Sequence, residues 1–240
     1  MHDSRPIGFF DSGIGGFTVW REVAALLPRE STVYIADSAH CPYGAKAQDE
    51  LVALSRQCVE MLLEDDCKLI VIACNTATAA AIDVLREAYS VPFVGMEPAV
   101  KPAALNTKTG VIGVLATEGT FNGRLFKETS ARFADTATIE TCVGNELVEL
   151  VESGKADTEE TFHVLERLLK PMLAKDIDHL VLGCTHFPYL RPHIRRIVGD
   201  TVAILDPAPA VARQVERLLA EKNALVLHGI PTHTLVTTTL

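Results

Sequence analysis

Two cysteines occupy matching places in the sequence and could supply acid–base chemistry. Cys74 follows the apolar run 69–73, and Cys184 follows a second apolar run within 178–188. Runs of this kind, too short to span a membrane as a helix, are typical of strands buried on both faces of a parallel sheet. Polar residues that favour helix starts come directly after each cysteine. We therefore expect both thiols at the carboxyl ends of parallel strands, where open α/β sheets bind their ligands.

A single buried cysteine usually contributes only to packing. The pair is different, because Asn75-Thr76 follows Cys74 and Thr185-His186 follows Cys184 in the same way. Two thiols on opposite sides of a small molecule could invert a carbon stereocentre, since one base removes the proton from one face and the other returns a proton to the opposite face. A thiol with a reference pKa of about 8.5 suits this task, and a helix N-terminus favours its thiolate.

Three further side chains are candidates for assisting the thiols. Asp11 precedes a glycine-rich turn, His186 lies two residues after Cys184, and Glu152 precedes Ser153-Gly154 at an expected helix end. A nearby carboxylate would raise the pKa of a thiol, and a histidine could exchange a proton with it. Each residue also has an ordinary interpretation: a turn or cap for Asp11, a hydrogen-bonded core imidazole for His186, and a solvated helix face for Glu152.

The sequence contains donors that could hold an anionic small molecule. Ser12-Gly13 and Gly15-Gly16 could present backbone N–H groups at a helix start. This segment has neither the spacing of a dinucleotide-binding turn nor the lysine of a P-loop. The side-chain donors are Asn75, Thr76, Thr117, Thr120 and Thr185.

Composition narrows the class of protein. The chain has 240 residues and a formal net charge of −9 without a basic cluster, so nucleic acid is not expected as its main partner. No apolar run reaches the roughly 20 residues of a membrane span, and the N-terminus lacks the apolar core of a signal peptide. The six cysteines form no C-x-x-C pair, and Cys184-x-His186 has no second pair of ligands, so we expect no bound metal. The cysteines also do not form a disulfide framework, so we expect the protein in a reducing cytoplasm.

Alternating strands and helices indicate an α/β fold with parallel sheets. Residues 7–13 and 112–118 resemble each other, since both are an apolar strand ending in a small polar residue. We predict two similar open parallel-sheet α/β units that face each other, with the active site in the cleft between them. The predicted first domain is 1–97 plus 208–240, and the second is 98–207. Asn75 and Thr76 are expected to cap one helix, another helix is expected to start near Pro188, and the helix 207–220 is expected to return to the first unit.

Five ordered motifs resemble those of glutamate racemases, within the aspartate/glutamate racemase superfamily. The similarity covers residues 7 to about 220, and the C-T-H-F-P form resembles glutamate racemases more than aspartate racemases, in which an acidic residue typically follows C-T. The motifs are Asp11-Ser12-Gly13-Ile14-Gly15-Gly16, Asp37-Ser38 with Pro42-Tyr43-Gly44, Cys74-Asn75-Thr76-Ala77, Ala116-Thr117-Glu118-Gly119-Thr120 and Leu182-Gly183-Cys184-Thr185-His186-Phe187-Pro188.

The resemblance implies interconversion of L- and D-glutamate without a cofactor, which supplies D-glutamate for bacterial peptidoglycan. It implies that Cys74 acts on the D-isomer and Cys184 on the L-isomer, with Asp11, Glu152 and His186 in support. Glutamate is the expected small-molecule partner, and we expect a homodimer. The implied substrate contacts are Ser12, Asp37, Ser38, Tyr43, Gly44, Asn75, Thr76, Thr117, Thr120 and Thr185.

Alternatives stay open at this stage. An aspartate racemase, or a decarboxylase or isomerase of the same superfamily, would share the fold, and some of these enzymes use one cysteine. A binding protein that retains the pocket without catalysis is a different class. The chain departs from the family pattern at Gly123 and Gly144-Asn145, and the segment after Leu225 does not resemble the usual ending of the family.

Overall fold

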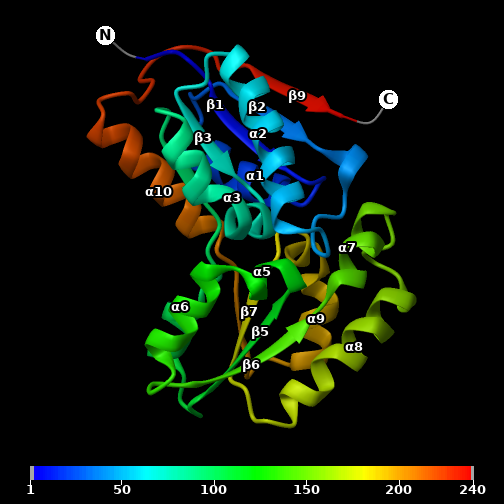
Figure 1. Cartoon of the computed structure of the whole chain (residues 1–240). Coiled ribbons are helices and arrows are strands. Elements are labelled where there is room, and N and C mark those ends of the chain that lie inside the picture. Colours follow the sequence, from blue (N-terminus) through cyan, green and yellow to red (C-terminus); the bar gives the residue numbers. More distant parts are fainter. Residues whose placement is uncertain (1–2, 239–240) are drawn as a thin grey trace. The chain divides into compact units, whose positions relative to one another are not determined.

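The computed structural model describes residues 3–238 and divides the chain into two compact units. Unit 1 comprises residues 1–96 and 208–240, and unit 2 comprises residues 97–207. Each unit is built on its own parallel sheet (Figure 1). The prediction of two parallel-sheet α/β units is confirmed. That the segments 1–97 plus 208–240 and 98–207 are independent domains stays a prediction.

Unit 1 contains a sheet with the strand order β4-β3-β1-β2-β9 among the described residues, and every pairing in it is parallel. The bounds are β1 Ile7–Asp11, α1 Phe17–Leu26, β2 Thr32–Ala36, the 3₁₀ helix η1 Ser38–His40, α2 Gln48–Glu64, β3 Leu69–Ile72, α3 Asn75–Ala88, β4 Phe93–Gly95, α10 Ala208–Glu221 and β9 His233–Thr237.

Helices cover both faces of this sheet, which explains why its inner strands are continuously apolar (Figure 1). On one face, Phe9 and Val71 pack in the same cluster as Val19 of α1 and Val215 of α10. On the other face, Gly8 lies so close to α2 that an added Cβ atom would come within 3.1 Å of the Leu62 side chain. The prediction that the helix at 207–220 returns to the first unit is therefore correct.

Unit 2 contains a sheet with the strand order β6-β5-β7-β8 among the described residues, again parallel throughout. The bounds are α4 Val100–Asn106, β5 Val111–Ala116, α5 Glu118–Asn122, α6 Arg124–Phe133, β6 Thr138–Val143, α7 Asn145–Glu152, α8 Glu159–Leu173, β7 His179–Gly183, the 3₁₀ helix η2 Phe187–Leu190, α9 Arg191–Val198 and β8 Ala203–Leu205.

The two sheets share one topology. In unit 1 the first strand, β1, pairs with β2 on one side and β3 on the other; in unit 2 the first strand, β5, pairs in the same way with β6 and β7. The fourth strand of each unit, β4 or β8, then pairs with the third. Cys74 and Cys184 each lie just beyond the third strand of their unit, so the two thiols hold equivalent places in the repeat.

One predicted helix cap is wrong in detail, and the helix start expected near Pro188 is that of a 3₁₀ helix. Cys74 itself is the N-cap of α3, whereas Asn75 and Thr76 are its first helical residues. Cys74 takes the N-cap position because the extended strand conformation continues through this residue, with φ −136° and ψ 122°. After Cys184 the chain first makes the 3₁₀ helix η2, which contains Pro188, and α9 begins only at Arg191.

The segment after Leu225, which had no assigned role, adds a fifth strand to the sheet of unit 1. β9 pairs in parallel with β2, from Thr32 opposite His233 to Ala36 opposite Thr237, and lies along the edge of the sheet (Figure 1). A buried ion pair helps to hold the start of this segment: Lys68 Nζ lies 2.7 Å from Glu30 Oε2, and Glu30 Oε1 accepts from the backbone N–H of Val226 at 2.8 Å. The final segment is therefore an integral part of unit 1.

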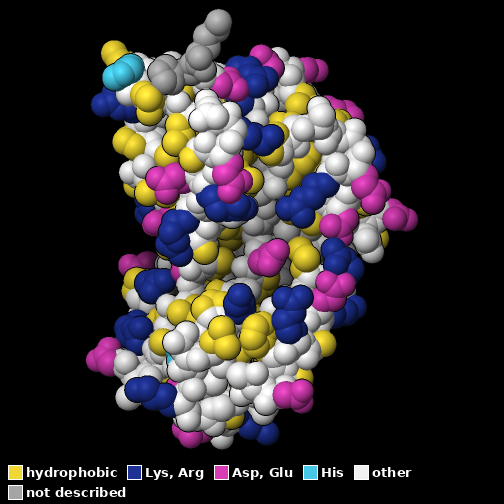
Figure 2. All heavy atoms as spheres, turned by 90° about the vertical axis from the view of Figure 1, so that its left-hand side faces the viewer, with side chains coloured by type: hydrophobic (Ala, Val, Ile, Leu, Met, Phe, Trp, Pro, Cys, Tyr) yellow, Lys and Arg dark blue, Asp and Glu magenta, His cyan; other side chains and the backbone are white. Residues whose placement is uncertain are grey.

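The surface carries charges of both signs. On the face shown in Figure 2, Lys and Arg side chains are interspersed with Asp and Glu side chains. Among residues 3–238, no helix has the length and apolar character needed to cross a bilayer.

Candidate active site

Polar residues follow β1, β2 and β3 at the carboxyl edge of the sheet in unit 1. Asp11 ends β1, Asp37 follows β2, and Cys74 lies two residues beyond the end of β3. The backbone N–H of Asp37 donates to the carbonyl oxygen of Asp11 at 2.9 Å, so the strand register extends to these residues. Parallel strands end at the same edge of a sheet, and the register therefore brings these groups together.

Asp11 organises the glycine-rich turn that leads into α1. Its carboxylate is fully buried and accepts a hydrogen bond from the backbone N–H of Gly16 at 2.7 Å. Tyr34 donates its hydroxyl hydrogen to the carbonyl oxygen of Gly13 at 2.9 Å, on the other side of the same turn. A Cβ atom on Gly16 would lie 2.5 Å from the Tyr34 oxygen, so glycine is required there. The turn is thereby held in one conformation at the start of a helix, where anions bind readily.

Cys74 caps α3 with its sulfur. The Sγ atom accepts a hydrogen bond from the backbone N–H of Ala77 at 3.4 Å, and the side chain is buried. The first turn of the 14-residue helix α3 contains no acidic residue, so the positive end of the helix dipole acts on the sulfur. This arrangement favours the thiolate form of a cysteine.

Asn75 offers hydrogen bonds that the described residues do not use. It is 3% exposed, and neither its side-chain nitrogen nor its side-chain oxygen has a partner. Buried polar groups are rarely left unsatisfied in folded proteins, so an orphaned amide next to Cys74 suits a ligand that brings both a donor and an acceptor. This agrees with the role as a substrate contact that the resemblance implies for Asn75, which stays a prediction.

The loop after β2 is folded around the carboxylate of Asp37. Tyr43 donates its hydroxyl hydrogen to Asp37 Oδ2 at 2.5 Å, and His40 Nδ1 lies 2.8 Å from Asp37 Oδ1. Burial raises the pKa of Tyr43, and the nearby Cys58, Asp37 and Cys74 raise it further, so the phenol stays a hydrogen-bond donor. Ser38 and Gly44, the other predicted contacts of this loop, directly follow Asp37 and Tyr43 in the sequence.

Cys58 is a neighbour of this loop that the sequence did not reveal. Burial raises the pKa of its thiol to about 12, and the carboxylates of Asp37 and Asp11 act in the same direction. Cys58 lies on α2 and is buried. Its position on α2, far from any motif, offers no sequence signal of its closeness to Tyr43.

In unit 2, two threonines lie beside the cysteine strand. The register pairs Ala116, the last residue of β5, with Gly183, the last residue of β7. Thr117 and Cys184 are the next residues after these two neighbouring strands. The hydroxyl oxygens of Thr117 and Thr120 lie 3.0 Å apart, and Thr120 also donates to the carbonyl oxygen of Gly183 at 3.5 Å. These hydroxyl groups are buried at the carboxyl edge of the sheet, where Thr185 is buried as well.

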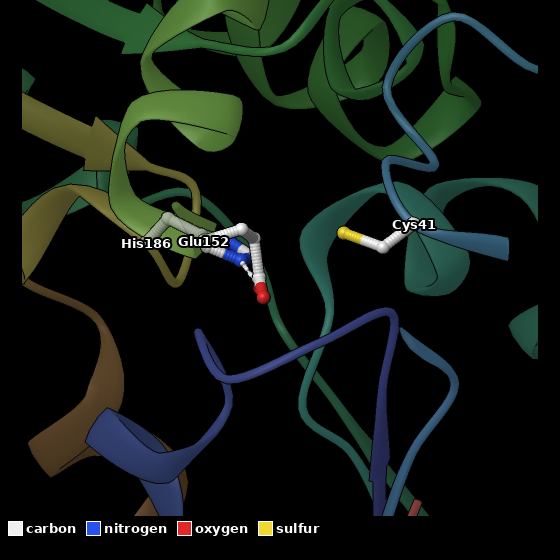
Figure 3. A group of neighbouring side chains, drawn as sticks. All are labelled: Cys41, Glu152 and His186. Carbon is white, nitrogen blue, oxygen red and sulfur yellow. Dashed lines mark hydrogen bonds and ion pairs between the residues drawn. The ribbon is translucent and has the colours of Figure 1, made fainter. Parts of the chain in front are cut away.

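Cys184, His186 and Glu152 form a chain of contacts in unit 2. Cys184 Sγ lies 3.7 Å from His186 Nδ1, and His186 Nε2 lies 2.5 Å from Glu152 Oε1, an interaction shown in Figure 3. A carboxylate only accepts, so the proton of a neutral His186 resides on Nε2. Nδ1 is then free of hydrogen and can take a proton from the thiol, while Glu152 stabilises the resulting imidazolium.

The local structure explains why Glu152 points to His186. Glu152 is the last residue of α7, after which Ser153 and Gly154 end the helix, and Gly154 adopts a left-handed φ of 75°. The start of α7 is tied to α5, since Asn145 Oδ1 accepts from the backbone N–H of Glu118 at 3.0 Å. Gly144-Asn145, where the chain departs from the family pattern, therefore still anchors the helix that carries Glu152.

The predicted site residues thus fall into two groups at equivalent sheet edges. Unit 1 contributes Asp11, Ser12, Asp37, Ser38, Tyr43, Gly44, Cys74, Asn75 and Thr76, and unit 2 contributes Thr117, Thr120, Glu152, Cys184, Thr185 and His186. Within each group, residues from several strand ends come together around one cysteine.

Comparison with known proteins identifies the class. Residues 18–215 match the model of the Asp/Glu/Hydantoin racemase family, and the chain belongs to that family. A glutamate racemase of Herpetosiphon aurantiacus is 49% identical over 92% of this chain and 87% of its own length. The resemblance to glutamate racemases that the motifs predicted is confirmed.

Solved structures agree with the sequence relatives. A glutamate racemase isoform of Bacillus anthracis superimposes with a TM-score of 0.91 at 34% identity, covering 100% of this chain and 90% of that one. A glutamate racemase of Francisella tularensis, solved in complex with D-glutamate, has a TM-score of 0.86 at 29% identity and covers 99% of this chain and 89% of that one. Within the family, the chain therefore belongs with the glutamate racemases.

Proposed function

We propose that this protein interconverts L- and D-glutamate by proton transfer to and from two cysteine thiols, Cys74 and Cys184. The observation that carries the proposal is the equivalence of these residues: each follows the third strand of its unit, at the carboxyl edge of a parallel sheet. The family to which the chain belongs supports the substrate, and the orphaned amide of Asn75 beside Cys74 supports a ligand at this edge.

The proposed reaction moves one proton at each face of the α-carbon. In the L-to-D direction, the Cys184 thiolate takes the α-proton, and the electron pair of the broken C–H bond stays on the substrate. Cys74 then donates its thiol proton to the opposite face of that carbon and becomes a thiolate. The D-to-L direction reverses both steps. Inversion requires the two thiols to stand on opposite faces of the bound substrate.

The supporting groups have separate tasks in this proposal. His186 receives the proton of the Cys184 thiol at Nδ1, which generates the thiolate, and Glu152 balances the charge of the imidazolium. Asp11 supports Cys74 through the turn that it anchors in the same unit. The substrate carboxylates are held by backbone N–H groups of the turn after Ser12 and by side-chain donors such as Asn75.

The cellular role follows from the reaction. We propose that the product, D-glutamate, is supplied to peptidoglycan synthesis in the cytoplasm. The six cysteines are all free thiols, which suits a reducing compartment. Assembly as a homodimer stays a prediction, and sedimentation velocity at several protein concentrations tests it.

The experiment that tests the reaction uses heavy water. Pure protein incubated with L-glutamate in D₂O is expected to form D-glutamate that carries deuterium at the α-carbon, because the second thiol delivers a solvent-derived proton. Chiral chromatography with mass spectrometry measures both products. Racemisation that stops when a metal chelator is added, or that requires added pyridoxal phosphate, would contradict the two-thiol mechanism. Exchange of the α-proton without any D-glutamate would contradict the second proton transfer.

A further inference from the structure

The carboxylate of Asp37 receives a third contact, and this one comes from the last described residue of the chain. Thr238 donates its hydroxyl hydrogen to Asp37 Oδ1 at 2.8 Å, and the same hydroxyl oxygen accepts from the backbone N–H of Ala39 at 3.1 Å. The backbone N–H of Thr238 in turn donates to the carbonyl oxygen of Ala36 at 3.1 Å. Thr238 thus ties both ends of the short turn that leads from β2 into the loop.

Asp37 is therefore occupied by the protein itself. Its side chain is 3% exposed, and its two oxygens meet Tyr43, His40 and Thr238. Three of the roughly four lone-pair positions of this carboxylate are therefore occupied. The carboxylate is well suited to fix the loop that contains Ser38 and Tyr43, since each hydrogen bond to a charged group restricts a different part of that loop.

We propose that Thr238 is a positioning residue of the active site, which acts through Asp37 to hold the loop of Ser38 and Tyr43 in the conformation that binds substrate. The proposal rests on the proposed function, because it assumes that this loop contacts glutamate. It gives β9 a role beyond extending the sheet: the strand delivers one hydroxyl group to the end of β2, 201 positions away in the sequence.

The surroundings of β9 make the inference testable. The single tryptophan, Trp20, donates its Nε1 hydrogen to Thr32 Oγ1 at 2.9 Å, and His233 Nδ1 lies 2.9 Å from the same oxygen. The rings of Trp20 and His233 meet edge to face with centroids 5.5 Å apart. Tryptophan fluorescence therefore reports whether β9 is seated on β2, independently of catalysis.

The test compares three variants of the full chain. Thr238→Val keeps the shape of the side chain and removes both of its hydrogen bonds; we expect KM for glutamate to rise about tenfold, with a smaller change in kcat, as for loss of a hydrogen bond to a charged group. Thr238→Ser keeps the hydroxyl group and should restore the wild-type KM. Thr234→Val makes the same chemical change at an exposed position of β9 and should leave KM and kcat unchanged.

A double-mutant cycle decides whether Thr238 acts through Asp37. Glutamate affinity is measured by calorimetry for Asp37→Asn, Thr238→Val and the double variant. If the proposal holds, Thr238→Val has little further effect once Asp37 is replaced. Additive effects would overturn the proposal even if Thr238→Val alters tryptophan fluorescence, because they would show that the variant only loosens β9. An unchanged KM in Thr238→Val would overturn it as well, whereas the absence of racemisation in the wild-type protein would refute the proposed function instead.

Discussion

Replacing Glu152 by glutamine removes the negative charge beside His186 with little change in shape. The carboxylate lies 2.5 Å from His186 Nε2, and in the proposed mechanism it stabilises the imidazolium that forms when Cys184 gives up its proton. Charge centres about 4 Å apart attract each other by about 4 kcal/mol at an effective dielectric constant of about 20. The Glu152 side chain is 22% exposed, so water screens part of this attraction. Solvent-exposed ion pairs contribute only about 0–1 kcal/mol, and we therefore expect an intermediate value of about 2 kcal/mol.

A loss of about 2 kcal/mol corresponds to a decrease of about 30-fold in rate, because about 1.4 kcal/mol is a factor of ten. The equilibrium between the two isomers cannot change, so kcat/KM falls by the same factor in both directions. The direction-specific information lies in the isotope effects. With α-deuterated L-glutamate, the primary isotope effect should increase in Glu152→Gln, since proton removal by Cys184 becomes more strongly rate-limiting. With α-deuterated D-glutamate it should change less.

Circular dichroism of glutamate follows racemisation continuously and gives these constants. Glu149→Gln is the matched control, because Glu149 lies on the same helix, α7, with its side chain exposed, and its replacement should leave kcat unchanged. Asp11→Asn should show the opposite isotope pattern, with the larger effect on D-glutamate. Full activity in Glu152→Gln, or the same isotope pattern in Glu152→Gln and Asp11→Asn, would refute the assignment of one supporting group to each thiol.

Three other predictions address the thiols and the stability of unit 1. Cys74→Ser and Cys184→Ser should each abolish measurable racemisation yet still bind glutamate in calorimetry, because a hydroxyl is a far weaker acid than a thiol; activity near the wild-type level in either variant would contradict the mechanism. Lys68→Met should lower the free energy of unfolding in urea by about 3–5 kcal/mol, because it leaves the buried carboxylate of Glu30 without its counterion, and an unchanged urea midpoint would disprove this. Cys58, with its thiol pKa raised to about 12, should react with iodoacetamide at pH 8 about 1,000-fold more slowly than a free thiol, and its rate should rise with pH; mass spectrometry of the labelled peptide measures this.

The strands next to the thiols were predictable because they are short apolar runs between turn residues. β1, β3 and β7 are continuously buried from one end to the other, with only His179 of β7 partly exposed. α6 was missed because its mean hydropathy is low and only Phe126 and Phe133 are buried. β9 was missed for a related reason: its residues are mostly exposed, and its strand conformation depends on pairing with β2.

The candidate site was also predictable only in part, because some of its contacts join residues that are far apart in the sequence. The groups near Cys184 lie within a few residues of the motifs or at a recognisable helix end, as Glu152 does. The contact of Thr238 with Asp37 joins residues far apart in the sequence, and no local pattern indicates such a contact. Cys58 approaches the site from the middle of α2, where periodicity predicts burial but not the identity of the neighbours.

The interruption of unit 1 by unit 2 has a consequence for biosynthesis. Unit 2 is one continuous segment, so all of its strands have been translated before α10 begins. Unit 1 begins first but cannot be completed until α10 and β9 have been translated. In the meantime its nascent sheet lacks the helix that covers Val19 and Val23, and the outer edge of β2 is open to pairing with other chains. We expect the nascent chain to depend on chaperones during this interval, and the later-starting unit to be the first to finish folding.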